Sequence, residues 1–145
     1  MKITLKTGVG EVLFGMKEKD VRNIYGEPDR HFKDEDKNSI WLYNDKKLRL
    51  TFYQDEEFRL GYIIISARSS ELFSENIIGK SWPEVEALAM KDGIKNFEKE
   101  TFDTVENYFN EANWVIFQVE FNQVIKIEMG ATINSNDEFD WKFKA

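Results

Sequence analysis

Two stretches of the sequence govern the expected fold: residues 14–24 read FGMKEKDVRNI, and residues 78–88 read IGKSWPEVEAL. Gly15 aligns with Gly79 at this spacing, and each glycine is followed six positions later by a valine. Because self-similarity at a fixed spacing is a signature of repeated structural units, the match predicts an internal duplication.

Each of the two stretches is predicted to form a short helix. In the second, Ser81 suits the N-cap position, Glu84 completes a capping box, and Pro83 lies in the first turn, where proline is tolerated. In the first, Gly26 followed by Pro28 is typical of a helix C-terminus.

Antiparallel strands are expected after each helix, because runs of β-branched and aromatic residues are separated there by short polar turns. The tail of the chain alternates polar and apolar residues and is predicted to form a last strand. The expected strands after the helices include residues 40–43, 47–53, 58–66, 114–121, 124–129 and 139–144.

These patterns predict an α+β fold built from two tandem repeats. In each repeat a short helical element precedes an antiparallel β-sheet, and the helices pack on one sheet face. The first repeat is expected to span residues 1–73 and the second, acidic repeat residues 74–145, with the two packed as one compact unit.

The alternation within the strands assigns side chains to the two faces of the sheet. Leu48, Leu50 and Phe52 form the apolar set that should pack under the helix. Applied to the second unit, the same pattern leaves Trp114 and Ile116 on the outer face. Tryptophan and tyrosine are favoured at protein interfaces, so this outer face is the candidate binding surface. The alternative is that these aromatic residues are buried by the tail or by the other unit.

An acidic run precedes the outer strand of the second unit and is expected to form a rim of that surface. A solvated acidic loop is the alternative. The predicted protein-binding residues are Tyr53, Arg49, Trp114, Ile116, Gln118, Glu120, Glu98, Glu100, Asp103 and Glu106.

The net charge of −7 is unevenly distributed. Residues 1–73 hold 13 Lys+Arg and 13 Asp+Glu, which gives 0, whereas residues 74–145 hold 7 and 14, which gives −7. A one-sided negative field attracts a cationic protein partner and repels nucleic acid, although acidic surfaces also simply aid solubility. No run approaches the ~20 apolar residues of a membrane helix, and the alternating start lacks a signal sequence, so no membrane partner and a cytoplasmic location are predicted.

The residue types that carry common catalytic chemistry are scarce. The chain has no cysteine and one histidine, His31, which excludes disulfides and thiolate chemistry and disfavours triads and multi-histidine metal sites. Carboxylates are abundant, but 27 of them in 145 residues produce any spacing by chance. The sequence therefore predicts no enzyme, no cofactor and no metal site.

The motif at residues 14–28, a Gly-Met turn, a short helix with an acidic-valine pair and then Gly-x-Pro, resembles the opening of BamE/SmpA-like and β-lactamase-inhibitor-protein-like domains. The resemblance implies helical elements on a small antiparallel sheet, repeated in tandem, and a protein-binding role without catalysis. This chain lacks the disulfides and the lipid-anchoring cysteine of those families.

The functional hypothesis from the sequence is a cytosolic immunity or inhibitor protein that occludes a basic toxin domain. One alternative is a structural or assembly module of a larger complex. The other is a small-ligand carrier or an enzyme with a pocket between the two units. The oligomeric state stays open.

Overall fold

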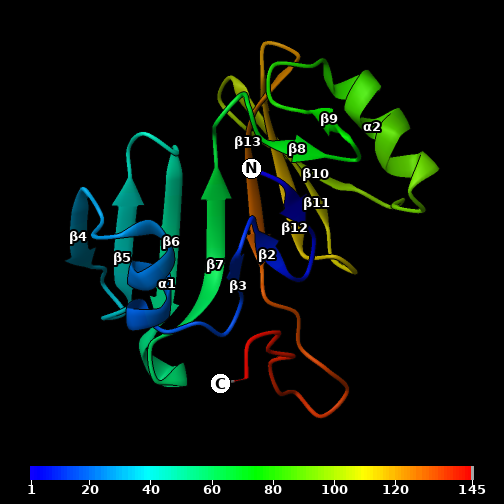
Figure 1. Cartoon of the computed structure of the whole chain (residues 1–145). Coiled ribbons are helices and arrows are strands. Elements are labelled where there is room, and N and C mark those ends of the chain that lie inside the picture. Colours follow the sequence, from blue (N-terminus) through cyan, green and yellow to red (C-terminus); the bar gives the residue numbers. More distant parts are fainter. Residues whose placement is uncertain (145) are drawn as a thin grey trace.

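The structure, a computed structural model, describes residues 1–144. Its centre is a single eight-stranded antiparallel sheet with the strand order β10-β11-β12-β13-β7-β6-β5-β4 (Figure 1). The strands of this sheet are β4 (Arg30–Lys33), β5 (Ser39–Tyr43), β6 (Leu48–Tyr53), β7 (Arg59–Ile65), β10 (Glu98–Phe102), β11 (Val105–Asn110), β12 (Val115–Glu120) and β13 (Gln123–Gly130).

One face of the sheet is covered by the remaining elements, which are drawn in front of it in Figure 1. A three-stranded meander and a two-stranded hairpin lie between the two helices along this face. The covering elements are β1 (Ile3–Thr4), β2 (Gly8–Val9), β3 (Val12–Leu13), α1 (Glu18–Tyr25), β8 (Glu71–Leu72), β9 (Glu75–Asn76) and α2 (Trp82–Lys91). A short 3-10 helix, η1 (Gln54–Glu56), connects β6 to β7.

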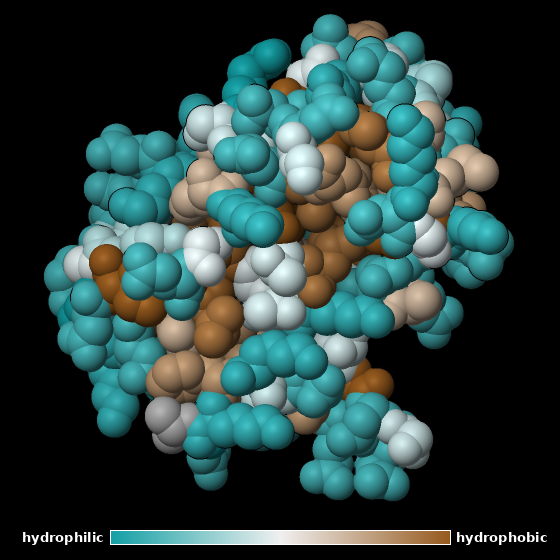
Figure 2. Space-filling view, turned by 45° about the vertical axis from the view of Figure 1, so that its right-hand side comes forward, coloured by the Kyte–Doolittle hydropathy of each residue, from teal (hydrophilic) through white to brown (hydrophobic). Residues whose placement is uncertain are grey.

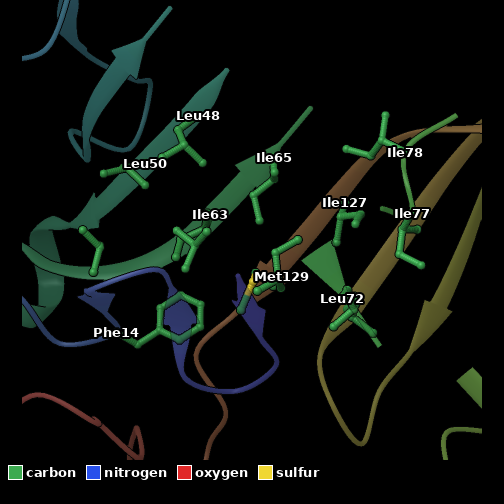
Figure 3. Packing of buried hydrophobic residues seen from close by; sticks show 14 of the residues in the cluster. Phe14, Leu48, Leu50, Ile63, Ile65, Leu72, Ile77, Ile78, Ile127 and Met129 are labelled. Atoms are coloured by element: carbon green, nitrogen blue, oxygen red, sulfur yellow. The ribbon is translucent and has the colours of Figure 1, made fainter. Parts of the chain in front are cut away.

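The hydrophobic core lies between the sheet and these elements. Side chains of β6, β7 and β13 point toward those of the covering segments (Figure 3). Phe14, just after β3, and Phe117 of β12 are fully buried in it. On α2, the Trp82 ring stacks on Tyr108 of β11 at 4.0 Å between centroids and packs against Phe117. We call this face the covered face of the sheet, and its packing stabilises the fold.

The helix boundaries follow the signals read from the sequence. The Ser81 hydroxyl accepts a hydrogen bond from the Glu84 amide at 3.4 Å, which confirms the predicted N-cap of α2. Gly26 ends α1 with φ of 78°, a left-handed conformation that costs glycine little.

The predicted α+β fold of two tandem helix-and-sheet repeats is wrong. Strands hold 42% of the residues and helices 15%, and the eight strands form one continuous sheet. The sheet is continuous because β13 pairs directly with β7, for example Glu128 opposite Ile64. The boundary expected between residues 73 and 74 falls in the turn of the β8–β9 hairpin.

Two polar strands were not foreseen. The sequence leaves residues 95–104 and 31–39 as charged connections, yet the first segment contains β10 and the second contains most of β4, and these are the two edge strands of the sheet. Every residue of both strands is exposed, so neither shows the alternation of apolar residues that reveals a strand.

The predicted tail strand is also wrong. The tail forms an isolated bridge between Ile133 and Phe139 and then crosses the end of the sheet. There the amides of Lys142 and Phe143 both donate to the carbonyl of Phe14, at 3.1 and 3.0 Å. Alternation alone could not reveal that this segment has no neighbouring strand with which to pair.

Within residues 1–144, no helix has the length and apolar character needed to span a membrane. On the side seen in Figure 2, hydrophilic side chains form most of the surface, and hydrophobic atoms are exposed in a band across its middle. The large hydrophobic side chains with the greatest exposure lie on edges, turns, the tail and α2, at Phe32, Met90, Phe102, Phe121 and Ile133.

Candidate functional site

The second face of the eight-stranded sheet, which we call the open face, is the candidate site. Among residues 1–144, no helix or strand is layered on it, and only the tail crosses one of its ends. A sheet face that is not covered must be satisfied by water or by a partner.

One row of side chains crosses the open face through all eight strands, because each residue is the register partner of the next. We call it the cross-sheet row. From β10 to β4 it reads Glu98, Phe109, Ile116, Glu128, Ile64, Arg49, Leu42 and Arg30.

Four of the six interior residues of the row are apolar, the other two are Glu128 and Arg49, and both ends are charged. Phe109, Ile116, Ile64 and Leu42 are half-buried, whereas the end residues Glu98 and Arg30 are exposed. Seven intervals of ~4.8 Å between strands give the row a length of about 34 Å. An apolar centre with a polar rim is the usual composition of a protein interface.

The two halves of the sheet are staggered about this row. Glu98 is the first residue of β10 and Arg30 is the first residue of β4, and these two strands run in opposite directions. The strands β10–β13 therefore extend to one side of the row and β4–β7 to the other. This stagger leaves two inside corners, and each corner holds a surface hollow.

The first hollow, which we call the Trp114 hollow, lies beside the β11–β12 turn and has a volume of about 650 Å³. Trp114, Ile133 and Ala112 give it apolar walls, and its charged lining consists of Glu98, Glu111 and Lys95, which leaves a net negative charge. Asn110 below it is buried and donates a hydrogen bond to the carbonyl of Lys95 at 2.5 Å.

The second hollow, which we call the basic hollow, lies beside the β5–β6 turn and has a volume of about 420 Å³. Lys47, Arg49 and Lys126 line it together with the apolar side chains of Leu42 and Ile64. The cross-sheet row thus connects an acidic corner with a basic corner.

Trp114 is held in place by its neighbours on the open face. Its ring makes edge-on contacts with Tyr62 at 5.5 Å and with Phe109 at 5.1 Å. It lies over Gly130, where a β-carbon would come within 3.0 Å of the ring. The Tyr62 hydroxyl in turn donates to the Glu128 carboxylate at 2.5 Å. Burial, reinforced by this hydrogen bond, raises the pKa of Tyr62, so its hydroxyl stays a donor at neutral pH.

Tyr53 also lies on the open face, but the tail covers it. Its ring sits over Gly61, where a β-carbon would come within 2.0 Å of the ring, and Phe139 packs on it at 5.8 Å. Burial raises the pKa of Tyr53. Its ring therefore serves to anchor the tail and is not free in this structure for a partner.

The structure places most of the predicted binding residues on one surface. Arg49, Ile116 and Glu98 belong to the cross-sheet row. On the same face, Gln118 and Glu120 follow Ile116 along β12, and Glu100 follows Glu98 along β10. Trp114 stands in the turn before β12 with φ of 48°, so the strand starts one residue later than predicted.

Two predicted residues lie elsewhere. Glu106 points to the covered side of the sheet, beside Val119, and forms an ion pair with Lys99 at 2.6 Å. Asp103 occupies the β10–β11 turn with φ of 58°. The acidic rim is therefore formed by strand residues and is narrower than the run in the sequence.

Sequence reasoning missed the middle of the site. Ile64 and Tyr62 lie in a run of apolar residues, LGYIIISA at 60–67, in which alternation cannot assign a face. Phe109 precedes a turn, and Leu42 was assigned to no face. Leu42 and Ile64 lie beside Arg49, and Phe109 lies beside Ile116, because these residues are register partners on neighbouring strands. Only the structure reveals this pairing.

Comparison with known proteins yields similarity of fold alone. No family model matches the chain, and no curated protein matches it. An extracellular protein containing a SCP domain from Bacillus anthracis aligns with a TM-score of 0.52 at 11% identity, over 87% of this chain and 49% of that protein. A DUF4309 family protein (YjgB) from Bacillus subtilis aligns with a TM-score of 0.51 at 14% identity, over 87% of this chain and 82% of that protein.

These neighbours correct the family expectation. The chain spans about half the length of the Bacillus anthracis protein. The resemblance to tandem β-lactamase-inhibitor-protein-like or BamE/SmpA-like repeats is wrong, and so is the immunity-protein assignment drawn from it, because the similar structures are SCP-domain and DUF4309 proteins. The motif at residues 14–28 is a turn and a short helix that many folds can use.

Proposed function

We propose that this chain is a non-catalytic protein-binding module that holds its partner against the open face of the sheet. The observation that supports this most directly is the cross-sheet row, with four half-buried apolar side chains on a face without a covering layer. A fully hydrated sheet face is usually polar, whereas most interior residues of this row are apolar and its ends are charged, which resembles the composition of an interface.

The dimensions of the face suit a protein partner. A width of about 34 Å and strands of about 20 Å give a projected area of roughly 700 Å², close to the ~800 Å² that each partner contributes to a standard interface. Both hollows are open rather than enclosed, so they suit side chains of a partner.

The charges on the open face suggest how the partner is oriented. Glu98, Glu100 and Glu120 lie on the half formed by β10–β13, and the proposed partner places a cationic segment against them. The net charge of −7 opposes nucleic acid as the partner. The cytoplasmic location stays a prediction. The neighbour described as extracellular supplies the alternative, and fractionation of the host cells would decide between them.

Site-specific cross-linking tests the proposal. A photoreactive amino acid at position 116 is expected to cross-link the partner in host cells, because Ile116 is a half-buried apolar residue in the interior of the row. The same group at position 90 is the matched control, since Met90 is an exposed apolar residue of α2 on the other side of the sheet.

The variant Ile116→Asp sharpens the test. It should abolish capture of the same partner while the variant still folds, with a melting temperature lowered by only a few degrees because the new carboxylate faces Glu128, and Met90→Asp should affect neither. If position 90 cross-links the partner and position 116 does not, the open face is not the binding surface and the proposal is wrong.

A further inference from the structure

The basic hollow has features that the proposed function does not use. It lies at the corner between the β5–β6 turn, the end of β7 and the side of β13, about 24 Å, or five strand intervals, from the acidic edge strand β10. Its cations are Lys47 and Arg49, which are close together in the β5–β6 hairpin, and Lys126 of β13.

These cations have no carboxylate partner of their own. Each of the six ion pairs formed within residues 1–144 uses other lysines and arginines. Arg49 lines the hollow, and its guanidinium lies 5.9 Å from the centroid of the Phe32 ring on the edge strand β4. In a chain with a net charge of −7, three cations that form none of these ion pairs gather at one concave corner and create a local positive field.

The hollow also offers neutral donors and an apolar floor. Asn44 and Ser66 line it, and the Ser66 hydroxyl donates a long hydrogen bond, 3.4 Å, to the Lys47 carbonyl, which also accepts from the Ser66 amide at 3.1 Å. Leu42 and Ile64 of the cross-sheet row form its floor. Charged donors around an apolar floor suit a carboxylate carried on a short aliphatic stem.

We infer that the basic hollow is a subsite for a carboxylate side chain in an acidic segment of the partner protein. This inference rests on the proposed function, because the hollow opens onto the same face. It also adds a requirement: the partner presents a cationic segment over Glu98 and Glu100 and an acidic one over Lys126 and Arg49, which lie three and five strand intervals, about 14 and 24 Å, from β10. Because the partner must match both a negative and a positive region of the face, its orientation is fixed and uniformly charged partners are excluded.

A short peptide rather than a polyanion fits this corner. The acidic side chains of β10 and β12 lie on the same face, and they would repel a long anionic polymer that extends beyond the hollow. Inorganic phosphate carries the charge without the aliphatic stem and therefore serves as the competing probe.

The test is a titration followed by the amide NMR signals of Asn44 and Ser66. A short glutamate-rich peptide should shift these signals saturably. The double variant Lys126→Gln and Arg49→Gln should weaken binding about tenfold, as expected for the loss of two exposed charge contacts. Lys19→Gln is the matched control, because Lys19 is an exposed lysine of α1 on the covered side, and it should change nothing.

The other results would overturn the inference. Equal weakening by Lys19→Gln would mean general charge attraction, and tighter binding of phosphate than of the peptide would mean an anion site without peptide recognition. The titration needs no natural partner, so it can fail while cross-linking at position 116 succeeds. In that case the protein-binding proposal stands and the carboxylate subsite does not.

Discussion

Phe117 and Ile116 are neighbours in β12, yet they belong to opposite surfaces of the same sheet. Phe117 is fully buried against Trp82 and Phe97, whereas Ile116 is half-buried in the cross-sheet row. The covered face obtains its stability from packing within the chain. The open face keeps apolar side chains in a position where only a partner can bury them further.

This difference predicts that mutations on the covered face affect folding, whereas mutations on the open face affect binding. A residue on the covered face stabilises the fold through the area it removes from water. A residue of the row contributes much less to folding, because it remains in contact with water. The predictions below use this contrast, in order of decreasing effect.

The largest effect is expected for Phe117→Ala. Removing a fully buried ring leaves a cavity among Trp82, Tyr108 and Phe97, which should lower the free energy of unfolding by about 3–5 kcal/mol. Ile116→Ala, one residue away, should cost about 1 kcal/mol or less. Urea denaturation measures both, and similar losses for the two variants would mean that the faces do not differ as described.

A smaller loss is expected for Gly61→Ala. The added methyl group would collide with the Tyr53 ring, which should cost up to about 3 kcal/mol through overpacking. The double variant Gly61→Ala with Tyr53→Ala should recover part of that loss relative to the sum of the single variants. Additive losses in the double-variant cycle would rule out the ring as the obstacle.

Alkaline pH should weaken the fold through a tyrosine of the covered face. Burial, aided by the nearby Glu27 charge, raises the pKa of Tyr43 to about 12, from about 10 in an unfolded chain. Its contribution is thus fully present below pH ~10 and is lost as the pH rises toward ~12, because the unfolded state ionises first.

Tyr43→Phe isolates this contribution. The melting temperature of the variant should fall less steeply between pH ~10 and ~12 than that of the parent. At neutral pH the variant should be somewhat less stable, because the Tyr43 hydroxyl donates to the Gly26 carbonyl at 2.7 Å. An unchanged slope would assign the alkaline loss to other groups.

The smallest effect is expected for Phe139→Ala in the tail. Phe139 stacks on Trp141 at 4.7 Å and packs on Tyr53, contacts worth about 1 kcal/mol. Loss of the ring should expose Tyr53 and move its pKa toward the ordinary value, which absorbance titration can detect. A Tyr53 signal that does not change would show that the tail does not cover the open face at this end.

Part of this structure could be predicted from single residues and their near neighbours. Ser81 and Gly26 mark helix ends because caps are local hydrogen-bonding and backbone effects. Leu48, Leu50 and Phe52 were assigned to the core because alternation reports one buried face. The edge strands β4 and β10 were not predicted, because polar strands show no alternation of apolar and polar residues.

The sequence by itself determined that Arg49, Trp114 and Ile116 would be candidates for one surface, because strand alternation is a property of the local backbone. Only the tertiary structure decided what that surface is. The pairing of β13 with β7 merged the expected repeats into one sheet, staggered its halves and placed acidic and basic hollows at opposite corners. The pairing of β13 with β7 depends on contacts between residues more than 60 positions apart, such as Ile64 and Glu128, and no local pattern records such contacts.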